Sequence, residues 1–137
     1  MKLFLLILLA MYSSLSIAQT SNGLFTAYSQ KRGISAFNME VKEVEVGKRF
    51  SVLDIPNFQG RTAQASRWLM CVYTELAIMR NAAYWASIYD ENSGDKVTLV
   101  FPKVNALTDP AFSGVDQMGV QPQIMLVETF KPFCGLN

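Results

Sequence analysis

Residues 60–81, GRTAQASRWLMCVYTELAIMRN, decide the fold of this chain because they hold its one long amphipathic pattern. At helical spacing, one side of the segment collects the apolar side chains Ala65, Leu69, Val72, Leu76 and Met79, with Tyr73 at their flank. A helix packs such a stripe against a sheet or another helix. We therefore predict one long helix over about residues 61–80, with a hydrophobic core beneath it.

Polar residues that we expect to face solvent occupy the opposite side of this helix: Gln64, Arg67 and Thr74. Cys71 and Ile78 lie among them, where water alone would not favour them, so we expect another segment to cover this side. The only other cysteine is Cys134, close to the C-terminus. Two cysteines in an exported chain favour a disulfide, although free thiols or bonds to another molecule are alternatives. We predict a Cys71–Cys134 bridge, and closing a loop of that length contributes roughly 4 kcal/mol to stability.

Residues 1–18 predict a signal peptide, since one lysine and a short apolar run lead to the small residues Ser16 and Ala18. The alternative is an uncleaved membrane anchor. A spanning helix needs about 20 apolar residues, and serines interrupt this run much earlier. We therefore expect residues 19–137 to form a single α+β domain in the periplasm or outside the cell, with no membrane span after cleavage.

Five strands are expected from alternation and β-prone composition, at about residues 37–46, 50–55, 84–89, 97–101 and 124–130. In the first strand the apolar alternation changes phase at Lys42 and Glu43. A bulge there would keep Val44 and Val46 on the core face. With one long helix and tight turns, the sheet should be antiparallel. The predicted fold is thus α+β: one helix on about five antiparallel strands, stapled by one disulfide.

The predicted hairpin at residues 84–101 has aromatic side chains on both faces, and only one face can meet the helix. The other face suits either a second covering layer or a partner surface. Residues 103–122 form a long loop with unexpected apolar residues, and long loops are often functional. We take four residues of the hairpin and the loop as candidates for binding a partner: Trp85, Tyr89, Phe112 and Met118.

Several chemistries are excluded by composition. The chain contains no histidine, which removes the usual Ser–His and Cys–His catalytic arrangements and imidazole zinc sites. Phosphate-binding glycine loops are missing too. With 12 basic and 11 acidic residues and no basic patch, a nucleic-acid partner is not expected. Residues 90–95 contain Asp and Asn but depart from a calcium-loop pattern, so a hairpin turn explains them better. We expect no metal and no cofactor.

Three functional hypotheses remain. The first is a small exported, non-enzymatic protein of the inhibitor, immunity or envelope-assembly type, which binds a protein partner. The second is a carrier that holds a small apolar ligand between sheet and helix. The third is a hydrolase of cell-wall sugars that uses two carboxylates among Asp54, Glu75 and Glu128, although such acids are more commonly surface residues or ion-pair partners.

Overall fold

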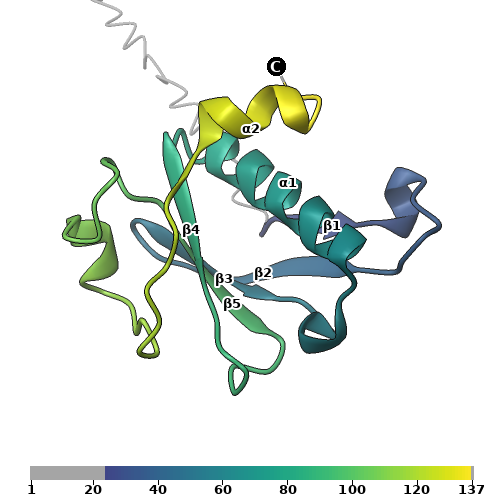
Figure 1. Ribbon diagram of the computed structural model, residues 1–137, viewed down its shortest axis with the longest axis horizontal. Helices are drawn as coiled ribbons and strands as arrows, with labels where there is room; N and C mark the ends of the chain where they lie inside the picture. Colours follow the sequence, from purple (N-terminus) through teal and green to yellow (C-terminus); the bar gives the residue numbers. More distant parts are fainter. Residues whose placement is uncertain (1–23, 137) are drawn as a thin grey trace, which may run out of the picture.

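The computed structural model describes residues 24–136, and the predicted signal peptide at residues 1–18 lies outside these described residues. The strands and helices are β1 (Thr26–Tyr28), β2 (Glu40–Val46), β3 (Phe50–Asp54), α1 (Ala63–Met79), β4 (Tyr84–Ile88), β5 (Lys96–Val100), β6 (Met125–Leu126) and α2 (Val127–Phe133). Figure 1 shows α1 lying across one face of a curled sheet, with α2 beyond it. The predicted α+β class is confirmed, but the sheet has six strands and not about five.

The sheet has the strand order β1-β2-β3-β5-β4-β6, and each neighbouring pair is antiparallel. Short turns join β2 to β3 and β4 to β5, as the sequence predicts. The sixth strand, β1, comes from the residues before the first predicted strand, and its Ala27 pairs with Val41. The outcome is a sheet whose central strands, β3 and β5, are flanked on both sides.

Two hydrophobic clusters lie on the two faces of the sheet. The larger one lies under α1 and includes Leu69, Val72 and Leu76 of the predicted stripe, although Met79 is 57% exposed. The smaller one lies on the opposite face, where residues of the 102–122 loop cover Ala86 and Ile88. The apolar residues of that loop therefore form a second covering layer on the sheet.

The bulge in β2 exists, but its consequence differs from the prediction. The register shifts between Glu43 and Glu45, and Val44 and Val46 are 45% and 49% exposed. The prediction that both valines face the core is wrong, because Glu43 occupies the core side in their place. Its carboxylate accepts hydrogen bonds from the Phe25 amide at 3.2 Å and from the Ser51 hydroxyl, and it pairs with Arg80 Nη2 at 2.5 Å. These donors allow a carboxylate to be buried.

Helix α1 starts two residues later than predicted. The Thr62 hydroxyl caps it by accepting a hydrogen bond from the Ala65 amide at 3.1 Å, which satisfies one of the free N–H groups of the first turn. At the other end Asn81 takes a left-handed conformation, with φ of 54°. These two features define where the helix begins and ends.

The strand predicted for residues 124–130 is wrong beyond Leu126. β6 runs antiparallel to β4, and Tyr84, the first residue of β4, already pairs with Leu126. The Val127 amide makes one further hydrogen bond, to the Ala83 carbonyl, and then the neighbouring strand ends. With no partner strand to continue the ladder, residues 127–133 form α2.

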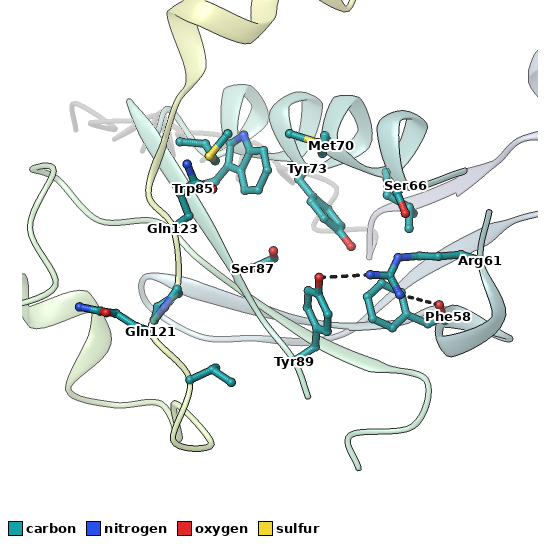
Figure 2. Close-up of a pocket in the computed structure, with 14 residues that line it drawn as sticks. Phe58, Arg61, Ser66, Met70, Tyr73, Trp85, Ser87, Tyr89, Gln121 and Gln123 are labelled. Carbon is teal, nitrogen blue, oxygen red and sulfur yellow. Dashed lines mark hydrogen bonds between the residues drawn. The ribbon is translucent and has the colours of Figure 1, made fainter. Parts of the chain in front are cut away.

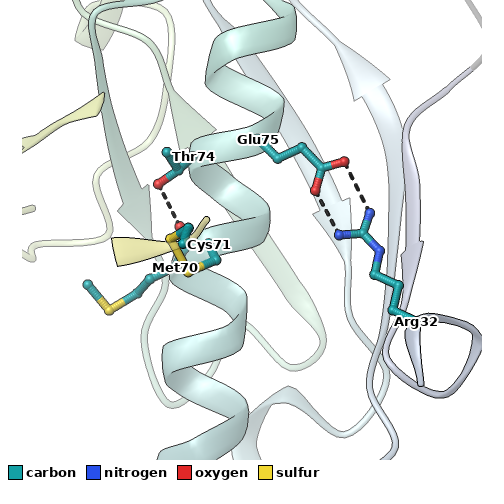
Figure 3. Close-up of polar contacts among 6 residues, drawn as sticks. Arg32, Met70, Cys71, Thr74 and Glu75 are labelled. Carbon is teal, nitrogen blue, oxygen red and sulfur yellow. Dashed lines mark hydrogen bonds and ion pairs between the residues drawn. A yellow bond between two sulfur atoms is a disulfide. The ribbon is translucent and has the colours of Figure 1, made fainter. Parts of the chain in front are cut away.

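The predicted disulfide is confirmed, with Cys71 and Cys134 bonded and their Cα atoms 5.4 Å apart. α2 lies against α1 and covers the side that carries Cys71. Figure 3 shows this bond on α1, together with the Thr74 hydroxyl that donates to the Met70 carbonyl. The expectation that Thr74 faces solvent is wrong, since it is fully buried. Its oxygen also accepts a hydrogen bond from Trp85 Nε1 at 3.0 Å, and these bonds allow a polar side chain to be buried.

Candidate functional site

The main cavity of the described residues lies between α1, β4 and the chain segment 120–125, and its volume is about 420 Å³. That volume is within the range of roughly 300–1,000 Å³ typical of small-molecule sites. Figure 2 shows side chains from α1 on one wall and from β4 on the facing wall, with the 120–125 segment between them at one end. The exposed Gln121 and Gln123 belong to this third wall.

The local geometry of the elements explains which side chains face the cavity. On α1, Ser66, Met70 and Tyr73 follow one another at helical spacings of four and three, so they share a face. On β4 and just beyond it, Trp85, Ser87 and Tyr89 alternate along the strand and share a face. The two walls are therefore the edge of the α1 stripe and the helix-facing side of β4.

One end of the cavity is apolar and rigid. Trp85 packs edge-on against Tyr73 with ring centroids 5.3 Å apart, and its indole N–H is held by Thr74. Met70 and Met125, the cross-strand partner of Trp85, also line the cavity here, and the exposed Gln123 lies beside Trp85 (Figure 2). Methionine adapts its shape to an apolar neighbour, and the indole, which is 2% exposed, adds only a small apolar contact, so this end is suited to an aliphatic or aromatic group.

The other end of the cavity carries one positive charge. The Arg61 guanidinium stacks over the Phe58 ring at 3.9 Å and lies 5.0 Å from the Tyr89 ring centroid. It donates from Nη1 to the Phe58 carbonyl at 2.8 Å and from Nη2 to the Tyr89 hydroxyl at 3.1 Å. Arginine has five N–H donors, so these two contacts leave others free. Within residues 24–136, Arg61 takes part in none of the ion pairs.

The hydroxyl of Tyr73 points into the cavity toward Arg61 (Figure 2). Tyr73 is only 4% exposed, and its hydroxyl makes no hydrogen bond to another described residue. Burial raises the pKa of this hydroxyl above its ordinary value, while the positive charge of Arg61 acts in the opposite direction. Tyr73 therefore presents a neutral O–H donor at physiological pH.

The four residues predicted to bind a partner do not lie on one surface. Trp85 and Tyr89 line the main cavity on the helix side of β4. Phe112 and Met118 pack on the opposite face of the sheet. Trp85 and Phe112 are each 2% exposed, so their rings contact the core of the protein itself. Partner binding by these residues stays a prediction.

The three carboxylates of the hydrolase hypothesis lie on different elements and have different partners. Asp54 on β3 pairs with Lys96 at 3.6 Å, and Glu128 on α2 pairs with Lys131 at 3.2 Å. Glu75 on α1 makes two bonds to the Arg32 guanidinium, at 2.7 and 3.1 Å (Figure 3). None of the three carboxylates lines the main cavity. The structure therefore does not bring them together around a common substrate site.

Two further properties concern the described residues as a whole. Among residues 24–136, no three acidic or cysteine side chains gather where they could bind a metal ion. None of the helices in this range is both long enough and apolar enough to cross a membrane.

Sequence reasoning missed the polar half of the cavity. Arg61, Ser66 and Ser87 carry no motif, and Gln121 lies far from them in the sequence. The only available signal was spacing, since Ser66, Met70 and Tyr73 fall on one flank of the α1 stripe. Comparison with known proteins gives no further guide, because no family model, curated protein or solved structure matches this chain.

Proposed function

We propose that this chain is an exported, non-enzymatic binding protein that holds a small, largely apolar ligand in the main cavity. The observation that carries the proposal is the cavity itself, about 420 Å³ between α1 and β4, with Trp85, Met70 and Met125 at one end and free polar groups at the other. Small-molecule sites commonly combine a mostly apolar wall with a few polar groups that fix orientation. This places the carrier hypothesis ahead of the protein-partner hypothesis.

The remaining parts of the proposal have separate support. Export to the periplasm or the cell exterior agrees with the signal-like residues 1–18 and with the Cys71–Cys134 disulfide, which persists in an oxidising compartment. A non-enzymatic role agrees with the lack of histidine and with three carboxylates that each have a cationic partner elsewhere.

Titration with N-phenyl-1-naphthylamine, a neutral apolar dye that fluoresces when it leaves water, tests the proposal. The oxidised protein should bind it saturably with one site. Ser87→Phe places a ring inside the cavity and should abolish binding. Thr98→Phe is the matched control, because Thr98 pairs with Ile88 and lies on the opposite face of the sheet. Lack of saturable binding by the wild type, or equal binding by Ser87→Phe, would contradict the proposal.

A protein partner is the second candidate. Phe133, near the disulfide at the end of α2, is 69% exposed, which makes it the most exposed of the large apolar side chains described. Exposed aromatic residues are common anchors in interfaces. Capture of one stoichiometric protein from an envelope extract, weakened by Phe133→Ser but not by Ser87→Phe, would favour this candidate over the carrier.

A further inference from the structure

The unusual feature of the main cavity is a cation without a counter-charge. The Arg61 guanidinium is partly exposed and is held against the cavity by stacking on Phe58 and by two hydrogen bonds. No described carboxylate forms an ion pair with it. A partly buried charge is costly unless it has a partner. The free N–H groups of Arg61 therefore mark the place where an anionic group would be stabilised.

The Tyr73 hydroxyl gives an independent indication. Its ring is buried, but its oxygen opens on the cavity, has no hydrogen-bond partner among residues 24–136, and points toward Arg61 (Figure 2). A ligand oxygen at this position would accept a hydrogen bond from it in place of water. The hydroxyls of Ser87 and Tyr89 face the same space and provide further neutral polar groups.

The charge and the lining together restrict the ligand. One guanidinium supplies one positive charge, which matches a singly charged group better than a doubly charged phosphate. Arginine also binds the two oxygens of a carboxylate in a planar, bidentate manner. At the opposite end, the Trp85 indole and the methionines favour an apolar or aromatic body.

We infer that the main cavity takes a small amphiphilic acid, whose single carboxylate lies at Arg61 and Tyr73 and whose apolar or aromatic body packs against Trp85, Met70 and Met125. This inference rests on the proposed function and specifies its ligand class. Arg61 supplies the charge, Tyr73 donates a hydrogen bond, and the two methionines with the exposed part of Trp85 provide the apolar contact.

The test compares 4-phenylbutyrate with 4-phenylbutyramide, which have nearly the same size but differ in charge. Each compound displaces the neutral dye N-phenyl-1-naphthylamine from the full oxidised protein. We expect the acid to bind at least about tenfold more tightly than the amide, because hydrogen bonds to charged groups are the stronger ones. Arg61→Gln should bring the two affinities together while dye binding persists. Arg67 on α1 is exposed and does not line the cavity, so Arg67→Gln should keep the preference.

A second variant covers the case in which Arg61→Gln disturbs the stacked rings. Tyr73→Phe removes only a hydroxyl that has no partner in the described residues, so the fold should persist. It should reduce the preference for the acid severalfold, whereas Tyr84→Phe, outside the cavity, should not. If the wild type binds the dye but does not prefer the acid over the amide, this inference alone is overturned. The same holds if the preference for the acid survives in both Arg61→Gln and Tyr73→Phe. Absence of dye binding by the wild type overturns the proposed function and this inference together.

Discussion

Glu43 offers the sharpest test of how this fold is held together, because its carboxylate is buried and has donors on three other segments. The side chain is fully buried, and Arg80, its ionic partner at the end of α1, is 30% exposed. The Phe25 amide and the Ser51 hydroxyl donate to the same carboxylate. Through its hydrogen bonds and its ion pair, the Glu43 side chain thus links β2 to β3, to the end of α1 and to the residue before β1.

The expected cost of Glu43→Ala follows from what it leaves behind. Removing one member of a buried ion pair typically costs about 3–5 kcal/mol, because the remaining charge has no partner. Water reaches part of Arg80, so we expect the lower end, about 3 kcal/mol. Glu43→Gln keeps the shape and can still accept from the Phe25 amide, and should cost about 1–2 kcal/mol. Glu45→Ala on the same strand is the control, because Glu45 is exposed and should change stability by less than about 0.5 kcal/mol.

Urea unfolding with the disulfide intact measures these differences. The unfolding midpoint should fall in the order Glu45→Ala, Glu43→Gln, Glu43→Ala, with an unchanged dependence of free energy on urea concentration. A double-mutant cycle with Arg80→Gln should give a coupling of about 0.5–3 kcal/mol. If Glu43→Ala costs no more than Glu45→Ala, the buried carboxylate does not stabilise the fold and the reasoning is refuted.

Three further outcomes are expected. Cys71→Ser or Cys134→Ser should lower the free energy of unfolding by roughly 4 kcal/mol, since the bridge spans 63 positions, and limited proteolysis should then remove the C-terminal residues; equal melting of the oxidised and reduced protein would contradict this. Asp109→Asn should lower the free energy of unfolding in urea by about 1–3 kcal/mol, because the Asp109 carboxylate accepts hydrogen bonds from the amides of Ala111, Lys103 and Val104. The exposed carboxylate of Asp116 accepts from one amide, so an equal cost for Asp116→Asn would argue against this explanation. The same amides, that of Ala111 foremost, hold the pKa of Asp109 below its ordinary value. The contribution of Asp109 to the free energy of unfolding should therefore be complete above about pH 3.9 and be lost as the pH falls further through the folded pKa. A stability difference between wild type and Asp109→Asn that stays constant into acid would exclude this linkage.

The parts of the fold that the sequence predicts well are those with a long, regular pattern. The α1 stripe spans enough turns to define both the helix and the covered position of Cys71, and from Cys71 the disulfide follows. The alternation of β4 likewise separates Trp85 from Ala86 and Ile88, which lie on the two faces of the sheet.

The wrong predictions arise where a short pattern allows two solutions. In β2, the same change of phase is obtained whether Val44 or Glu43 faces the core. Only the hydrogen-bond donors and the charge contributed by Phe25, Ser51 and Arg80 favour the arrangement in which the glutamate is buried. In residues 124–130, a short apolar run fits a strand or a helix, and the end of β4 decides between them.

The candidate site was less predictable than the fold. The aromatic character of Trp85 and Tyr89 points to two of its residues, but it predicts a surface for a partner and not the wall of a cavity. The site forms only when α1, β4 and segment 120–125 come together. Its lining residues, such as Arg61 and Gln121, lie far apart along the chain, so no local pattern reveals that they share one cavity.

The central claim is that the space between α1 and β4 receives a small ligand, and the fluorescence of Trp85 measures this most directly. Trp68→Phe leaves Trp85 as the only tryptophan, because the chain has two, and Trp68 does not line the main cavity. Titration of this variant with 4-phenylbutyrate should change the Trp85 emission saturably, with one molecule bound per chain. Emission that stays constant up to the solubility limit of the acid, in a folded and oxidised variant, would contradict the claim.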